Sequence, residues 1–198
     1  AEQEGISVEE VIELLLKRFS LTSYPENESH KKIDTAGIVI NGDGERRAFL
    51  VGIGMGPQAN MTIEAWTVFE KSDCILGAGR MLENLSILQK PVLDAYDPDK
   101  MLTYLREHPE YRNIAVALSG DVGFYSNAKR LITAFEKEGI GTELLPGISS
   151  VSYLCSKLRI AWEDVKLMSI HGRKENLIGA VCRNFRTFTL LGGTDPVQ

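Results

Sequence analysis

The chain has 198 residues, which is enough for one large domain or two smaller ones with a buried core. Apolar residues make up 43% and charged residues 25%, as in ordinary globular proteins, and the net charge is −5. This charge argues against a nucleic acid or a membrane surface as the main partner, and it leaves local basic clusters available for an anionic small molecule.

The N-terminal residues, 1–47, differ from the rest of the chain in their pattern of apolar and polar residues. Residues 6–19 are predicted to form a short amphipathic helix, because Ser7 and Glu10 have the spacing of a capping box before an apolar run. Residues 22–32 are polar, contain a proline and show no apolar period, which is typical of a linker. We therefore expect residues 1–47 to be an N-terminal helix and linker.

Strand-like and helix-like segments alternate from residue 48 onward. The predicted strands cover residues 48–53, 73–77, 114–118, 142–145, 165–170 and 186–191. The predicted helices cover residues 62–71, 98–107, 126–138, 148–159 and 174–184. Asp97 and Pro98 suit the start of a helix, and Gly139 suits the end of one. This alternation predicts an α/β protein with a largely parallel sheet.

Three glycine-containing loops directly follow predicted strands. Their sequences are GIGMGP at 52–57, LSGDVGFYS at 118–126 and LLPGISS at 144–150. Because ligands of open parallel sheets bind at the carboxyl ends of the strands, these loops predict one functional edge.

The first loop lacks the features of a dinucleotide site. Pro57 stands where the G-x-G-x-x-G motif requires its last glycine, and a proline there removes an amide that a pyrophosphate would bind. No acidic residue ends a second strand at the expected distance, and no GK[ST] sequence is present. A nicotinamide-binding Rossmann domain and a P-loop site are therefore disfavoured.

The other two loops each allow two interpretations. Asp121 either caps the following helix or accepts from a ligand's hydroxyl or ammonium group, while Gly120 and Gly123 leave backbone amides accessible. Ser149 and Ser150 are predicted to cap the next helix, whose first amides also suit a carboxylate or a phosphate.

The three cysteines, Cys74, Cys155 and Cys182, are widely spaced and form no CxxC pair. This usage favours reduced, buried thiols over a disulfide framework or a zinc site, and we expect no bound metal. The chain begins without a charged and apolar leader and contains no long apolar stretch, so a cytoplasmic protein is expected.

The order of these motifs resembles that of the tetrapyrrole methylases. It runs from GIGMGP through ILGAGRMLENL, LSGDVGFY and PGISSVSYLCSKL to MSIHGR. The combination of GAGR at 77–80, PGISS at 146–150 and IHGR at 170–173 is most similar to the group that methylates C5 of precorrin-6Y or cobalt-precorrin-7 (CbiE). The resemblance covers residues 48–195.

The resemblance implies a fold and a reaction. Two α/β lobes, at 48–143 and 144–198, would hold S-adenosylmethionine in the cleft between them, with a precorrin or cobalt-precorrin as methyl acceptor. A homodimer is implied, and the second lobe is expected to be incomplete, because the family continues into further strands. The stretch EGISVEEVIELL is similar to the end of precorrin-6A reductase (CbiJ), which implies a fused or neighbouring reductase.

The resemblance also implies site residues. The cofactor loops would contribute Met55, Ser119, Gly120, Asp121, Phe124, Ile148 and Ser149. Arg80 and Arg173 are candidates for binding substrate carboxylates, with a surface ion pair or a solvated side chain as the alternative. His171 is a candidate proton acceptor, with a plain hydrogen-bonded histidine as the alternative.

Two other functions stay open. One is methyl transfer by the same fold to another acceptor, such as a uroporphyrinogen or a protein side chain, against which the GAGR and IHGR sequences argue. The other is a non-catalytic interaction or channelling module beside a reductase.

Overall fold

The computed structural model describes residues 44–170 and 175–191. Their main feature is a five-stranded sheet in the order β3-β2-β4-β1-β5, in which all neighbouring strands are parallel. The strands are β1 (Arg47–Gly52), β2 (Cys74–Gly77), β3 (Val92–Asp94), β4 (Asn113–Leu118) and β5 (Gly141–Leu145).

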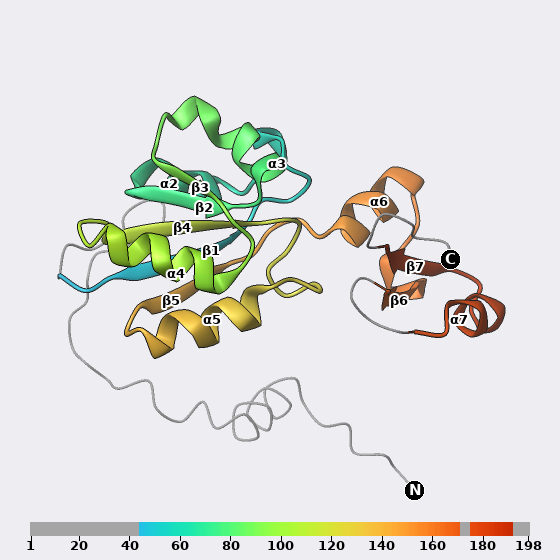
Figure 1. The fold of residues 1–198 in the computed structure, drawn as a ribbon. Helices are drawn as coiled ribbons and strands as arrows, with labels where there is room; N and C mark the ends of the chain where they lie inside the picture. Colours follow the sequence, from blue (N-terminus) through green and yellow to red (C-terminus); the bar gives the residue numbers. More distant parts are fainter. Residues whose placement is uncertain (1–43, 171–174, 192–198) are drawn as a thin grey trace, which may run out of the picture. The chain divides into compact units, whose positions relative to one another are not determined.

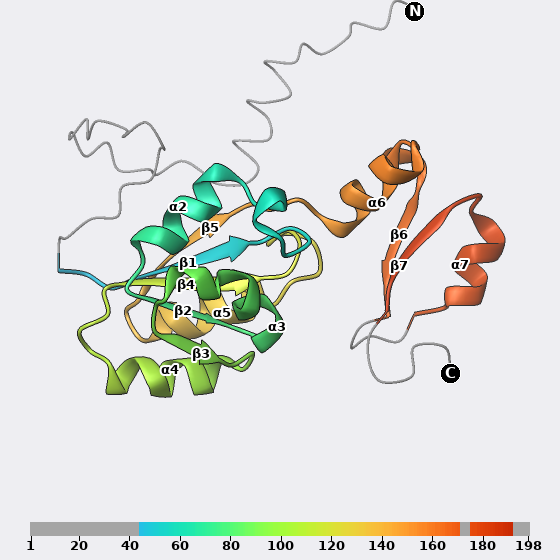
Figure 2. The same cartoon turned by 90° about the horizontal axis from the view of Figure 1, so that it is seen from above.

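Helices cover both faces of this sheet. They are α2 (Ile63–Lys71), α3 (Gly79–Leu82), α4 (Pro98–Glu107) and α5 (Ala128–Lys137), with short 3-10 segments at Gln58–Asn60 and Glu83–Leu88. Figure 1 shows α4 and α5 along one face and α2 and α3 along the other, and Figure 2 shows the second face from above.

The two central strands are buried on both faces, which explains their continuous apolar sequences. Successive side chains point to opposite faces of a strand. Accordingly, Leu50 of β1 packs in the cluster that contains Phe135 of α5, whereas Phe49 packs in the cluster that contains Phe69 of α2. Each face of the sheet thus has its own apolar core.

The remaining described elements form a second, smaller set. They are α6 (Ser150–Leu158), a 3-10 turn (Trp162–Asp164), β6 (Lys166–Ser169), α7 (Leu177–Arg183) and β7 (Thr187–Leu190). The last two strands pair in parallel, with Lys166 opposite Thr187 and Ser169 opposite Leu190.

The predicted α/β class with a largely parallel sheet is confirmed. Each strand and helix expected after residue 48 is present, and Gly139 has the left-handed backbone (φ +71°) predicted for a helix end. Asp97 stands at the start of α4 as expected, although its side chain caps no amide there. The short elements α3 and β3 were not predicted.

The predictions for residues 6–19 and 22–32, and the similarity to a reductase, lie outside the described residues. The domain boundaries at 47/48 and 143/144 stay predictions. No helix in the described part of the chain is long and apolar enough to cross a bilayer.

Candidate functional site

The two central strands mark a switch point in the sheet. β1 and β4 are neighbours, yet the chain leaves β1 for α2 and leaves β4 for α5, which pack against opposite faces. In open α/β sheets, ligands bind in the crevice that such a divergence opens beyond the carboxyl ends of the strands. The topology therefore places a candidate site after Gly52 and Leu118.

The three predicted loops meet at this point. The amide of Gly54 donates to the carbonyl of Gly120 (3.1 Å), and the amide of Gly120 donates back to Gly54 (2.9 Å). A Cβ atom on Gly147 would overlap the carbonyl oxygen of Gly120 and lie 2.6 Å from the carbonyl of Gly52. These backbones are in direct contact, which confirms the prediction that the loops share one edge.

Asp121 connects two of these loops. Its Oδ1 accepts from the amide of Gly123 (2.9 Å), and its Oδ2 accepts from the amide of Gly147 (3.1 Å), 26 residues further along the chain. The amide of Ala128 at the start of α5 instead donates to the hydroxyl of Ser126 (3.1 Å). The interpretation of Asp121 as the cap of the following helix is therefore wrong.

Ser149 caps α6, as predicted. It is the residue before the helix, and its hydroxyl oxygen accepts from the amide of Ser152 (3.3 Å). Ser150 is the first residue of the helix rather than a cap, and it faces the cavity described next.

A cavity of about 410 Å³ opens at the loops. The predicted site residues that line it are Met55, Arg80, Ser119, Gly120, Asp121 and Phe124. Ile148 and Ser149 belong to the adjoining loop and are not among the lining residues. His171 and Arg173 lie outside the described residues.

The cavity has further walls that the sequence did not indicate. They comprise Met81, Tyr96, Leu118, Tyr125, Ser126, Asn127, Ser150, Leu190 and Leu191. Tyr125 has a left-handed backbone (φ +51°), which is unusual for an aromatic residue and often marks a functional loop. Tyr125 could have been predicted as a site residue because it directly follows the predicted site residue Phe124. Tyr96 was missed because β3, the strand before it, has only three residues.

Comparison with known proteins gives the family. The model of the tetrapyrrole (corrin/porphyrin) methylases matches residues 48–196. The chain belongs to this family.

Individual relatives agree with this assignment. The chain is 31% identical over 141 residues to a probable cobalt-precorrin-7 C(5)-methyltransferase of Methanocaldococcus jannaschii, covering 65% of this chain and 62% of that protein. The chain therefore spans about three fifths of the length of this curated relative.

Two solved structures share the fold. The cobalamin biosynthesis precorrin-6Y methylase (cbiE) of Archaeoglobus fulgidus has a TM-score of 0.54 and 21% identity, covering 73% of each chain. Uroporphyrin-III C-methyl transferase of Thermus thermophilus, complexed with S-adenosyl homocysteine, has a TM-score of 0.53 and 18% identity, covering 66% of this chain and 59% of that one.

In this methylase chain, the lining of the cavity carries two charged side chains, those of Arg80 and Asp121. Arg80 lies in α3, whose first amide, from Gly79, donates to Oδ1 of Asp94 at the end of β3 (2.8 Å). This bond fixes the start of the short helix and so helps to place the arginine. Among the described residues, no three His, Cys, Asp or Glu side chains lie close enough to hold a metal ion.

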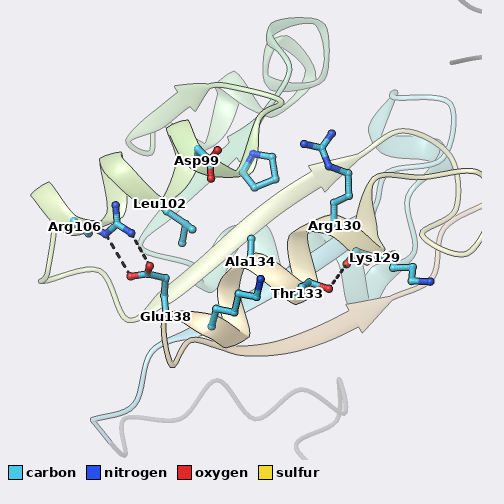
Figure 3. Close-up of a pocket in the computed structure, with 10 residues that line it drawn as sticks. Asp99, Leu102, Arg106, Lys129, Arg130, Thr133, Ala134 and Glu138 are labelled. Atoms are coloured by element: carbon cyan, nitrogen blue, oxygen red, sulfur yellow. Dashed lines mark hydrogen bonds and ion pairs between the residues drawn. The ribbon is translucent and has the colours of Figure 1, made fainter.

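A second hollow lies between α4 and α5 and shares no lining residue with the cavity at the methylase loops (Figure 3). It has a volume of about 510 Å³ and is lined by residues of these two helices and Glu138. Its most prominent contact is the ion pair between Arg106 and Glu138 (2.6 Å), which is exposed. None of the glycine-containing loops contributes to it, so we assign the site to the cavity at the strand ends.

Proposed function

We propose that this chain is part of an S-adenosylmethionine-dependent methyltransferase that modifies C5 of a precorrin or cobalt-precorrin in cobalamin biosynthesis. The observation that carries the proposal is the convergence of three loops on one cavity at the β1/β4 switch point. The family and the similarity to a probable cobalt-precorrin-7 C(5)-methyltransferase support the choice of substrate.

The cavity suits a nucleoside cofactor. Its volume of about 410 Å³ lies within the range of roughly 300–1,000 Å³ that is usual for small-molecule sites. Met55, Leu118 and Phe124 offer apolar surface, while Ser119 and Ser150 offer hydroxyl groups. A protein of the same fold has been solved with S-adenosyl homocysteine, which supports the same cofactor here.

Methyl transfer requires little from the side chains beyond the correct placement of the cofactor and the acceptor. S-adenosylmethionine, when bound, supplies a methyl group that the sulfonium has already activated. The acceptor is an electron-rich ring carbon, so the chain has to align the two reactants and exclude water. Apolar walls such as Phe124 and Leu190 perform the second task. His171 is our candidate for taking up the proton that the ring carbon loses.

The substrate carries several carboxylates, for which arginine is the best-suited partner. Arg80 lines the cavity and is exposed, so its guanidinium is available to a ligand at the mouth of the cavity. Arg173, in the IHGR sequence, is proposed for the same task. We further propose that the protein acts as a cytoplasmic homodimer near, or fused to, precorrin-6A reductase.

The first test is calorimetric titration with S-adenosylhomocysteine, the product form of the cofactor. We expect micromolar binding that weakens about tenfold in Phe124→Ala, because an aromatic wall of the cavity is lost. Phe185→Ala is the matched control, since this phenylalanine is 93% exposed and does not line the cavity. A folded chain that does not bind, or equal losses in both variants, would contradict the proposal.

The second test concerns the acceptor. The chain is incubated with S-adenosylmethionine and either a cobalt-precorrin-7 or uroporphyrinogen III, and the product masses are compared. A gain of one methyl group on the first substrate alone supports the proposed acceptor. Methylation of uroporphyrinogen III instead would assign the chain to a different reaction of the same fold, and cofactor binding without transfer to either would favour a non-catalytic module.

A further inference from the structure

We propose that Asp121 is a positioning residue, which fastens the loop before α6 onto the loop after β4 and does not bind the ammonium group of the cofactor. The inference rests on the proposed function only for the identity of the ligand. It follows from how the carboxylate is used within the protein.

Both oxygens of the carboxylate already serve backbone amides. Oδ1 accepts from Gly123 (2.9 Å) and thereby closes the turn that follows Asp121. Oδ2 accepts from Gly147 (3.1 Å) in a partly buried position, and this bond joins segments 26 residues apart. Hydrogen bonds from an amide to a charged acceptor are stronger than neutral ones, so this pair is well suited to hold a loop.

The loop that Asp121 holds is in close backbone contact with the other two loops. A Cβ on Gly52 would lie 2.6 Å from the amide nitrogen of Gly147 and 2.7 Å from the carbonyl oxygen of Gly120. Real Cβ atoms do not approach backbone this closely, so Gly52 and Gly147 are required for the contact, while Gly120 is required for its left-handed backbone (φ +71°). The carboxylate thus secures a backbone-to-backbone contact at which three loops of the site meet.

This contact determines where α6 begins. Gly147 is followed by Ile148, by the helix cap Ser149 and by Ser150, which lines the cavity. If the bond to Gly147 is lost, Ser150 and the first turn of α6 lose their fixed place in the cavity wall. Asp121 therefore acts on the ligand through the loop.

The variant Asp121→Asn disrupts the arrangement in a defined way. An amide side chain has one oxygen and one NH2 group, so it can accept from Gly123 or from Gly147 but presents a donor to the other. An unpaired, partly buried amide is costly. Asp99→Asn is the matched control, because it removes the same charge from an exposed position in α4 outside the cavity.

The decisive experiment compares two ligands in these variants. S-adenosylhomocysteine carries the amino-acid ammonium group, and 5′-methylthioadenosine is the corresponding nucleoside thioether without it. We expect Asp121→Asn to weaken both ligands by the same factor, about tenfold, and Asp99→Asn to change neither. Weakening of S-adenosylhomocysteine alone would show a direct ammonium contact and overturn the inference, as would unchanged binding of both.

Asp121→Glu provides a second variant that keeps the charge. Its longer side chain moves both oxygens away from their amides, so we expect it too to weaken both ligands equally. Full retention of binding in Asp121→Glu overturns the inference, because an ammonium partner needs the charge but not this reach.

A measurement without ligand separates this inference from the proposed function. Hydrogen exchange at the Gly147 amide, followed by NMR, should be about tenfold faster in Asp121→Asn than in the parent chain or Asp99→Asn. If the parent binds neither ligand, the proposed function fails while the exchange rates still decide the role of Asp121. Equal exchange rates in all three proteins would refute that role.

Discussion

The five-stranded sheet and the β6–β7 pair use the same parallel pairing but differ in burial. Five of the six residues of β4 are buried, whereas all four residues of β7 are only half-buried. Parallel sheets are normally covered on both faces, and a two-stranded sheet alone is marginal. The first region therefore contains the apolar core that stabilises the described residues, and the second has little of its own.

The carboxylates of the two regions also differ in what they bind. In the first region, Oδ2 of Asp73 accepts from the amides of Arg112 (2.8 Å) and Asn113 (2.7 Å), Asp94 accepts from the first amide of α3, and Asp121 accepts from loop amides. In the second, Asp164 makes a long, exposed ion pair with Arg186 (4.0 Å). Side chains thus fix both ends of the first sheet, with Asp73 at the amino ends of β2 and β4 and with Asp94 and Asp121 at the carboxyl ends, where the candidate site lies.

The largest effect should come from the core of the first region. Phe69→Ala removes a fully buried ring of α2, and we expect the free energy of unfolding to fall by about 3–5 kcal/mol. Phe185→Ala in the second region should change it by less than about 0.5 kcal/mol, because this ring is already exposed. Urea unfolding of both variants tests the difference, and similar losses would show that the regions are equally important for stability.

A smaller effect is expected where the loops meet. Gly147→Ala places a methyl group against the backbones of Gly52 and Gly120, which should cost about 1–3 kcal/mol and weaken binding of S-adenosylhomocysteine. Gly141→Ala is the control, since the nearest atoms to its Cβ would lie 3.8 Å away. If both variants unfold and bind alike, the close contact of the loops is not important for the site.

Several of these features could be predicted from sequence, and others could not. The central strands were visible as continuous apolar segments, and chain order alone predicted that GIGMGP, LSGDVGFYS and LLPGISS share an edge. β3 was missed because three residues carry too little pattern, and its first residue, Val92, is half exposed. The bond between Asp121 and Gly147 depends on tertiary packing between distant segments, which no local pattern specifies.

The buried Cys74 thiol makes the stability of the core depend on pH. Burial, with a smaller contribution from Asp73, raises the pKa of Cys74 to about 12, against about 8.5 in an unfolded chain. The folded state holds this proton more tightly than the unfolded chain does. The contribution of the neutral Cys74 thiol to the free energy of unfolding is therefore complete below about pH 8.5 and is lost as the pH rises towards 12.

Cys74→Ala isolates this contribution. The difference in free energy of unfolding between the parent and Cys74→Ala should shrink by about 1 kcal/mol between about pH 7.5 and about pH 9.5. Cys155 and Cys182 are present in both proteins, so their titration cancels in the comparison. A difference that does not change with pH would mean that the Cys74 thiol is not shielded from water in the folded protein.

The smallest effect is expected from the most prominent ion pair of the first region. Arg106 and Glu138 are 2.6 Å apart beside the hollow between α4 and α5 (Figure 3), but both side chains are exposed and compete with water and salt. Arg106→Ala, Glu138→Ala and the double variant should unfold at the same urea concentration as the parent, in low salt and in high salt. A salt-dependent coupling between the two substitutions would show that charge contributes to the stability of this region. Its absence would leave buried apolar surface as the main source of the difference in stability between the two regions.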